Sequence, residues 1–181
     1  CLHCNELLLR HVISKLDGKT SSKEGFSGPI GKLLSRVNSM ERNYNFQPIP
    51  GLEELLDIPQ DIVKNMSTDS SILYQLGLAI RSGKLSKQLG TKKSGNICHS
   101  RWLTTGEAVI FLWVSDHGLE GELLERLEII TTFVVQVYHH MYFEIKVKHG
   151  IIDGPNHVLT QLRLIRQQPK VVQDIVISIA M

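Results

Sequence analysis

Apolar residues recur at intervals of three and four along most of this chain, and polar residues fill the positions between them. This is the periodicity of helices that bury one face, and it is interrupted at clusters of glycine, proline and serine. We therefore expect a mainly α protein, a bundle-like set of helices with at most a few short strands. The predicted helices cover residues 5–16, 30–40, 59–66, 105–117, 120–148 and 156–167, with others beginning near Ser67 or Thr68 and at Pro169.

The stretch at residues 129–147 leaves two interpretations open. Apolar residues at helical spacing, from Leu123 to Ile145, favour one long helix over residues 120–148. The same stretch is rich in β-branched residues, and apolar and charged side chains alternate towards its end, which favours a strand. We expect the helix and keep the strand as the alternative.

The helix predicted at residues 156–167 has a well-defined apolar stripe. Its members recur at helical spacing and are Val158, Leu159, Leu162 and Ile165. A stripe of this kind normally faces the core, so we expect these side chains to be buried.

The segment around Trp102 is the most distinctive part of the sequence. Thr104 and Glu107 have the spacing of a capping box, in which two side chains satisfy the free amides at a helix start. We therefore expect a helix to begin near Thr105 and to end before Gly118. Trp102 is expected to pack beneath this helix start, so that Trp102, Thr104 and Glu107 form a structural anchor.

Composition and the chain ends add limits to this picture. With 181 residues, 42% of them hydrophobic, the chain can bury the core of one or two domains. Pro48 and Pro50 bracket a turn, so we place a boundary there, between an N-terminal region at residues 1–50 and a helical region at residues 51–181. Apolar, helix-like sequence reaches both ends, and we expect an internal piece of a longer protein.

The cysteine count and the charges bear on location. Three cysteines are too few, and odd in number, for a disulfide scaffold, which indicates a reducing compartment. We expect an intracellular protein, with the nucleus as one candidate location. Polar residues such as Gln136 and Glu144 interrupt the most apolar stretch, so we predict no membrane span.

A zinc site is one alternative for the cysteines. Cys1 and Cys4 are separated by two residues, as in zinc knuckles, and Cys98 with His99 would complete four ligands. The other interpretation is that the cysteines are small buried apolar side chains. The neighbours His139 and His140 face different directions on a helix, so we expect them to be structural or solvent-facing.

The sequence shows no complete catalytic constellation. The acidic residues of the helix that follows Gly118 recur on what is expected to be its solvated side, and no glycine-rich phosphate loop follows a strand. We therefore predict no cofactor and no complete active site for this piece, and the sequence leaves its enzymatic activity open.

One stretch of the chain is locally basic, although the formal net charge of the whole is only +2. Basic side chains here are suited to neutralise the phosphates of a nucleic acid, and a solvated loop is the plainer interpretation. The candidate contact residues are Arg81, Lys84, Lys87, Lys92 and Lys93, followed by His99 and Arg101.

Several segments of the sequence resemble those of one protein family. The block HSRWLTT at residues 99–105 resembles a block of uncharacterised, mobile-element-like proteins of arthropods, cnidarians and nematodes. The resemblance extends over most of the chain. Its other segments lie at residues 1–7, 10–11, 17–20, 26–31, 66–69, 145–146 and 153–154.

That family is remotely similar to hAT-type transposases with an RNase H-like domain. In those enzymes a cysteine and a histidine follow a catalytic aspartate, and an Arg-Trp pair opens a helical insertion; Cys1, His3, Arg101 and Trp102 would match these landmarks. The resemblance implies that residues 1–50 are a remnant of the RNase H-like core and that most of the rest is the helical insertion. It also implies that the metal-binding acids lie before Cys1 and beyond Met181.

Three functions follow as hypotheses. The leading one is a fragment of a transposase-derived protein that lacks a complete catalytic site and acts as a scaffold, in self-association or in contact with the DNA backbone. The alternative is a helical protein–protein interaction module unrelated to nucleic acid. The third is an enzyme with zinc bound by Cys1, Cys4, Cys98 and His99.

Overall fold

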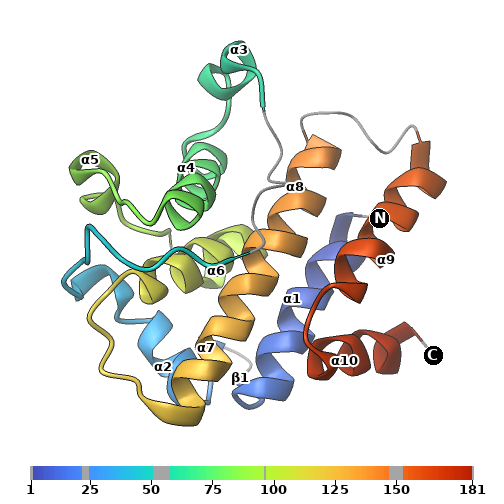
Figure 1. Ribbon diagram of the computed structural model, residues 1–181, viewed down its shortest axis with the longest axis horizontal. Helices are drawn as coiled ribbons and strands as arrows, with labels where there is room; N and C mark the ends of the chain where they lie inside the picture. Colours follow the sequence, from blue (N-terminus) through green and yellow to red (C-terminus); the bar gives the residue numbers. More distant parts are fainter. Residues whose placement is uncertain (1, 22–24, 51–57, 96, 147–152, 181) are drawn as a thin grey trace.

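The computed structural model describes residues 2–21, 25–50, 58–95, 97–146 and 153–180 (Figure 1). This part of the chain is mainly helical, which confirms the predicted fold class. The helices are α1 (Leu2–Leu16), α2 (Pro29–Leu34), α3 (Gln60–Lys64), α4 (Thr68–Ser82), α5 (Lys87–Gly90), α6 (Ile97–Trp113), α7 (Gly121–Phe133), α8 (His139–Lys146), α9 (Gly154–Arg166) and α10 (Lys170–Ala180). A 3₁₀ turn, η1 (Val37–Ser39), and a π-helical segment, η2 (Val134–Tyr138), complete the helical elements.

The strands of the described part form one very small hairpin. β1 (Thr20–Ser21) pairs antiparallel with β2 (Gly25–Phe26), with Thr20 opposite Phe26. It lies between α1 and α2, outside the helices predicted at residues 5–16 and 30–40. The helix predicted at residues 30–40 is divided in the structure into α2 and η1.

Helix α6 lies at the centre of the molecule. Residues 108–112 are fully buried on every side, which is typical of a helix enclosed by others. It packs against α4 on one side and α7 on another. Figure 1 shows α1, α9 and α10 grouped on the opposite side of the long α7–η2–α8 helix from α4 and α5.

The long helix predicted at residues 120–148 is confirmed as far as Lys146, and the strand alternative is wrong there. α7, η2 and α8 follow one another without a break (Figure 1). The β-branched residues of this stretch are buried against other helices, and tertiary packing of this kind outweighs their preference for strands. Residues 147–148 lie outside the described residues.

The predicted capping box is wrong. Helix α6 begins at Ile97, so Thr104 and Glu107 lie in its interior, and both are fully buried. Because the backbone amides there already bond within the helix, no free amide remains for these side chains to cap. The helix also ends earlier than expected, at Trp113. Trp102 lies within α6 and packs on Phe26, with ring centroids 6.1 Å apart.

The predicted orientation of α9 is also wrong, except at Ile165. Val158, Leu159 and Leu162 are exposed by 55%, 53% and 51%, while Ile165 is 8% exposed. The inward positions are taken by His157 and Gln161, which are both buried.

Apolar side chains from both sides of the predicted boundary at residue 50 join one buried cluster. Leu9, Val12 and Ile30 belong to it together with residues of α4, α6 and α8. Helix α1 packs against α7 and α10, which lie far along the chain. The division into two regions stays a prediction. None of the described helices has both the length and the apolar character needed to cross a bilayer.

Candidate functional site

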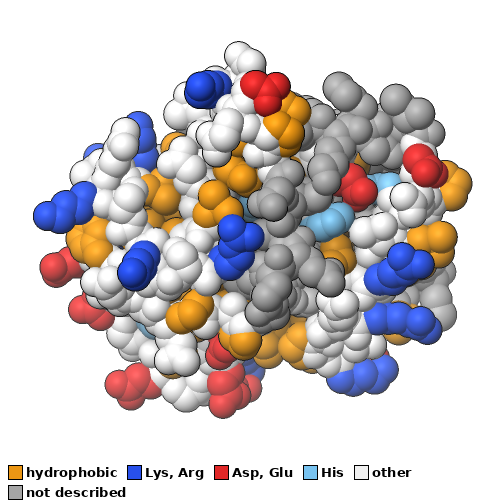
Figure 2. All heavy atoms as spheres, turned by 45° about the horizontal axis from the view of Figure 1, so that its top comes forward, with side chains coloured by type: hydrophobic (Ala, Val, Ile, Leu, Met, Phe, Trp, Pro, Cys, Tyr) orange, Lys and Arg blue, Asp and Glu red, His pale blue; other side chains and the backbone are white. Residues whose placement is uncertain are grey.

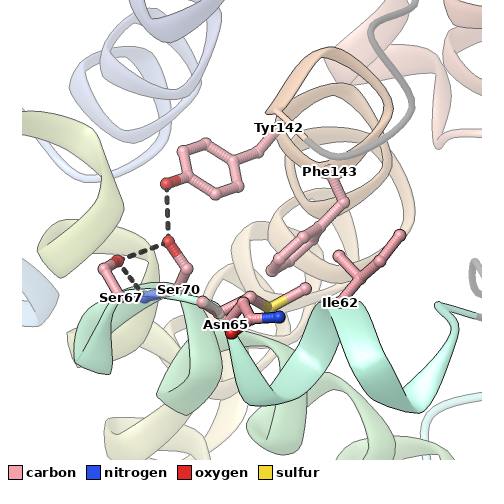
Figure 3. A pocket seen from close by; sticks show the side chains of 7 residues that line it. Ile62, Asn65, Ser67, Ser70, Tyr142 and Phe143 are labelled. Atoms are coloured by element: carbon pink, nitrogen blue, oxygen red, sulfur yellow. Dashed lines mark hydrogen bonds between the residues drawn. The ribbon is translucent and has the colours of Figure 1, made fainter.

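A pocket of about 310 Å³ opens between α3, the start of α4 and α8 (Figure 3). Its wall combines apolar side chains with hydroxyl and amide groups. The lining residues are Ile62, Asn65, Met66, Ser67, Ser70, Tyr142 and Phe143.

A chain of hydroxyl groups runs along this pocket. The Ser67 hydroxyl accepts the backbone N–H of Ser70 at 3.3 Å and so caps α4, which starts at Thr68, within the predicted start near Ser67 or Thr68. The Ser70 and Ser67 hydroxyl oxygens lie 2.8 Å apart, and the Ser70 and Tyr142 hydroxyl oxygens lie 2.9 Å apart. These hydroxyl groups connect the start of α4 to α8, and the lining residues include no His, Lys or Arg side chain.

A buried carboxyl group lies in the interior of α6. Glu107 is fully buried, and neither of its oxygens makes a hydrogen bond of normal geometry with a described residue. Burial, and then the charge of Asp69, raise the pKa of Glu107 to about 8, while the backbone amide of Gly95 acts in the opposite direction. At neutral pH this carboxyl group is therefore mostly protonated.

His139 is buried at the junction of the π-helical segment and α8. Its ring lies 4.5 Å from the Phe143 ring and 6.1 Å from the Tyr74 ring, centroid to centroid. Burial, and then the neighbouring His140, lower the pKa of His139 to about 3, so the ring is neutral at physiological pH. The expectation of a structural role for His139 agrees with this apolar setting.

A second polar group connects α8 to α9. His157 Nδ1 lies 2.8 Å from Glu144 Oε2, and His140 Nδ1 lies 3.5 Å from the same oxygen. Gln161 Nε2 bonds with His157 Nε2 on the other side of the ring. Within the described residues no group of three His, Cys, Asp or Glu side chains has the arrangement of a metal site.

The predicted basic residues come together at the end of α4 and around α5. Arg81, Lys84, Lys87, Lys92 and Lys93 are all exposed, and residues 70–95 contain no acidic side chain. We call these five side chains the α4–α5 basic surface. Figure 2 shows basic side chains on the side of the molecule that carries these helices.

A groove adjoins this surface. It has a volume of about 420 Å³ between α3, α4 and α5, and Lys64 joins Lys92 at its wall beside Gln75 and Gln88. The ion pairs within the described part of the chain lie elsewhere, within α7, α8 and α10 and between α8 and α9. The lysines are thus available to an external anion.

Two sets of predicted residues lie outside the described side chains. They are the basic extension at His99 and Arg101, and the zinc alternative at Cys1, Cys4, Cys98 and His99. Both stay predictions.

The sequence did not reveal the hydroxyl chain or the buried Glu107. Ser70 and Tyr142 are far apart along the chain, so no local pattern connects them. For Glu107 one signal was present, since the residues that follow it, 108–112, are almost continuously apolar and indicate a fully buried helix.

Comparison with known proteins finds no matching protein family, no matching curated protein and no matching solved structure.

Proposed function

We propose that this chain is a non-catalytic helical module that contacts the phosphate backbone of DNA through the α4–α5 basic surface. One observation carries the proposal: five exposed cations, without an acidic residue among them, are concentrated in residues 70–95. The chain as a whole has a formal charge of only +2, so the remainder is net acidic. This uneven distribution is the electrostatic pattern of a surface that binds a polyanion.

The side chains on this surface favour backbone contact over the recognition of bases. Four of the five are lysines, which bind phosphates as point charges. They extend from a helix end, a four-residue helix and a loop, so no long helix presents them to a major groove. Contacts of this kind fix position on a duplex without reading its sequence.

In the same proposal the chain derives from a transposase and acts as a scaffold in its parent protein. The support is the resemblance of residues 99–105 and the mainly helical fold, which suits a helical insertion. The metal-binding acids then belong to other parts of the parent, and this chain positions DNA or neighbouring subunits.

The test is binding to a labelled DNA duplex of random sequence, followed by fluorescence anisotropy between about 50 and about 200 mM salt. We expect measurable affinity at low salt that falls steeply as salt increases. The double variant Lys92→Gln with Lys93→Gln should weaken binding and reduce the slope of log K against log salt by roughly 2, because each phosphate contact contributes about 0.9.

The matched control is Arg163→Gln with Arg166→Gln, which removes two exposed positive charges from α9 instead. It should leave the slope within error of the unmodified protein. The proposal fails if no binding occurs at low salt, or if both double variants lose the same affinity, because the effect would then reflect net charge alone.

A further inference from the structure

Helix α9 presents three aliphatic residues to solvent and two polar residues to the core, where Leu164 and Ile165 are also buried. Val158, Leu159 and Leu162 are each more than half exposed, whereas His157 and Gln161 are each 8% exposed. At these five positions this is the reverse of the usual distribution on a surface helix.

The exposed aliphatic residues form a continuous stripe. Leu162 comes four residues after Val158 and three after Leu159, and residues at these spacings are neighbours on a helix surface, so Leu162 adjoins both. Single exposed aliphatic residues are common and need no explanation, but contiguous ones mark interaction sites. Among the described residues, the large hydrophobic side chains that are exposed are concentrated on α9 and α10, with Tyr44 as the exception.

Polar contacts hold α9 in this orientation. His157 Nδ1 lies 2.8 Å from Glu144 Oε2, and Gln168 donates its Nε2–H to Gln136 Oε1 at 2.6 Å. Turning the stripe inward requires both contacts to break and leaves Glu144 and His157 to find new partners while buried. These polar contacts therefore keep the stripe exposed to solvent.

The charges beside the stripe indicate what covers it. Arg163 and Arg166 follow it in the next turn of α9, both exposed, and residues 154–169 contain no acidic side chain. Asp153, at the helix start, accepts the backbone N–H of Asn156 as the cap. Figure 2 shows basic and hydrophobic side chains together on the side of the molecule that carries α9 and α10.

From this arrangement we infer that the outward face of α9 is a docking surface for an amphipathic, acidic helix of a partner protein. Its aliphatic side chains, spaced by three and four residues, pack on Val158, Leu159 and Leu162, as helices do in hydrophobic grooves. Its carboxylates pair with Arg163 and Arg166. A second copy of this chain would bring the same two arginines and no carboxylate within its α9, so it is the poorer complement.

This inference goes beyond the proposed DNA contact and concerns a different face. Its probe is a synthetic amphipathic peptide with a leucine stripe and glutamates beside it, measured against the 181-residue protein by fluorescence anisotropy. A second peptide carries lysine in place of each glutamate. We expect the acidic peptide to bind at least about tenfold more tightly than the basic one, because the arginines attract one and repel the other.

Variants locate the binding site. Leu162→Gln should weaken binding of the acidic peptide about tenfold, since it places an amide in the centre of the apolar contact. Arg163→Gln with Arg166→Gln should reduce the preference for the acidic peptide. Ile177→Gln, at a residue on α10 that is 50% exposed, is the matched control and should leave binding unchanged. All these side chains are exposed, so the fold should tolerate the changes, and circular dichroism checks this.

Several outcomes overturn the inference. One is equal binding of both peptides, and another is equal loss with the α9 and α10 variants. Sedimentation that shows a dimer abolished by Leu162→Gln would assign the face to a second copy. Binding to vesicles of anionic lipid through Leu162, with no preference between the peptides, would assign it to a membrane surface.

Discussion

The carboxylate of Asp17, just beyond the end of α1, accepts the backbone N–H of Gly31 in the first turn of α2 at 2.6 Å. Its other oxygen accepts the N–H of Ile30 at 2.9 Å. Gly28 occupies the N-cap position of α2 and has no side chain to cap with, so Asp17 supplies the cap from the turn that follows α1. Gly28 must also remain small, because an added Cβ would lie 1.7 Å from the backbone oxygen of Asp17.

The first prediction concerns this cap. Asp17→Ala removes a buried acceptor and leaves two buried amides without their partner, so we expect the free energy of unfolding to fall by about 2 kcal/mol. Urea denaturation followed by circular dichroism measures the change. Asp116→Ala, at an exposed position, should stay within about 0.5 kcal/mol of the unmodified protein. An equal effect of both changes would show that the two hydrogen bonds contribute nothing.

The second prediction follows from the pKa of Glu107, which burial raises to about 8 from its ordinary value of 4.5. Between these values the unfolded chain is ionised at Glu107 while the folded chain stays protonated. The folded state therefore binds more protons, and stability must fall as pH rises across this window. The slope approaches roughly 1.4 kcal/mol per pH unit, the value for one proton.

The measurement for Glu107 is the free energy of unfolding at several pH values between about 5 and about 8. In Glu107→Gln the side chain is neutral at every pH, so its curve should be flatter than that of the unmodified protein. The difference between the two proteins isolates this one group from the other titrating residues. Parallel curves would mean that the carboxyl group is ionised in the folded state at no cost.

The third prediction concerns the close approach of α4 to His139. A Cβ added at Gly77 would lie 2.8 Å from the His139 Nε2 atom. Alanine favours a helix over glycine by about 1 kcal/mol, but overpacking a buried contact costs about 1–3 kcal/mol. We therefore expect Gly77→Ala to lower the melting temperature, whereas Gln75→Ala, at an exposed position of the same helix, should not.

A double-mutant cycle tests the cause of the Gly77 effect. His139→Ala makes room beside α4, so Gly77→Ala should cost less in that background than in the unmodified protein. If the two changes are additive, the destabilisation by Gly77→Ala does not come from contact with His139.

These contacts also show how much of the fold was readable from the sequence. Local patterns were sufficient where neighbouring residues determine the structure. The start of α4 near Ser67 follows from turn chemistry, and the long α7–η2–α8 helix follows from the spacing of its apolar residues. They failed at Thr104 and Glu107, because a capping box is recognised by spacing, which also occurs by chance inside a helix. The burial of Glu107 depends on helices from distant parts of the chain that pack against α6.

The orientation of α9 shows a second limit. Its apolar stripe predicted an inward face, yet the pairing of Glu144 with His157 directs the polar side inward. No local pattern encodes that pairing, since the two residues belong to different helices. The two candidate surfaces differ in the same respect. The α4–α5 basic surface could be predicted from the charges along the sequence, whereas the outward apolar face of α9 can be recognised only once the packing of the helices is known.

The last prediction compares two glutamates that pair in different surroundings. The Glu144 side chain is 18% exposed and lies 2.8 Å from His157, whereas the Glu122 side chain is 76% exposed and pairs with Arg126 within α7. Exposed pairs spaced by four residues contribute about 0.3–0.5 kcal/mol, but removing one partner of a mostly buried polar contact costs about 1–3 kcal/mol.

We therefore expect Glu144→Ala to destabilise the protein by about 2 kcal/mol and Glu122→Ala by less than about 0.5 kcal/mol. Because Glu144 connects α8 to α9, its loss should also weaken the attachment of α9 in particular. Hydrogen exchange should then show faster exchange of α9 amides than of α6 amides in Glu144→Ala. Uniform acceleration across both helices would mean that the contact stabilises the whole fold without fixing the orientation of α9.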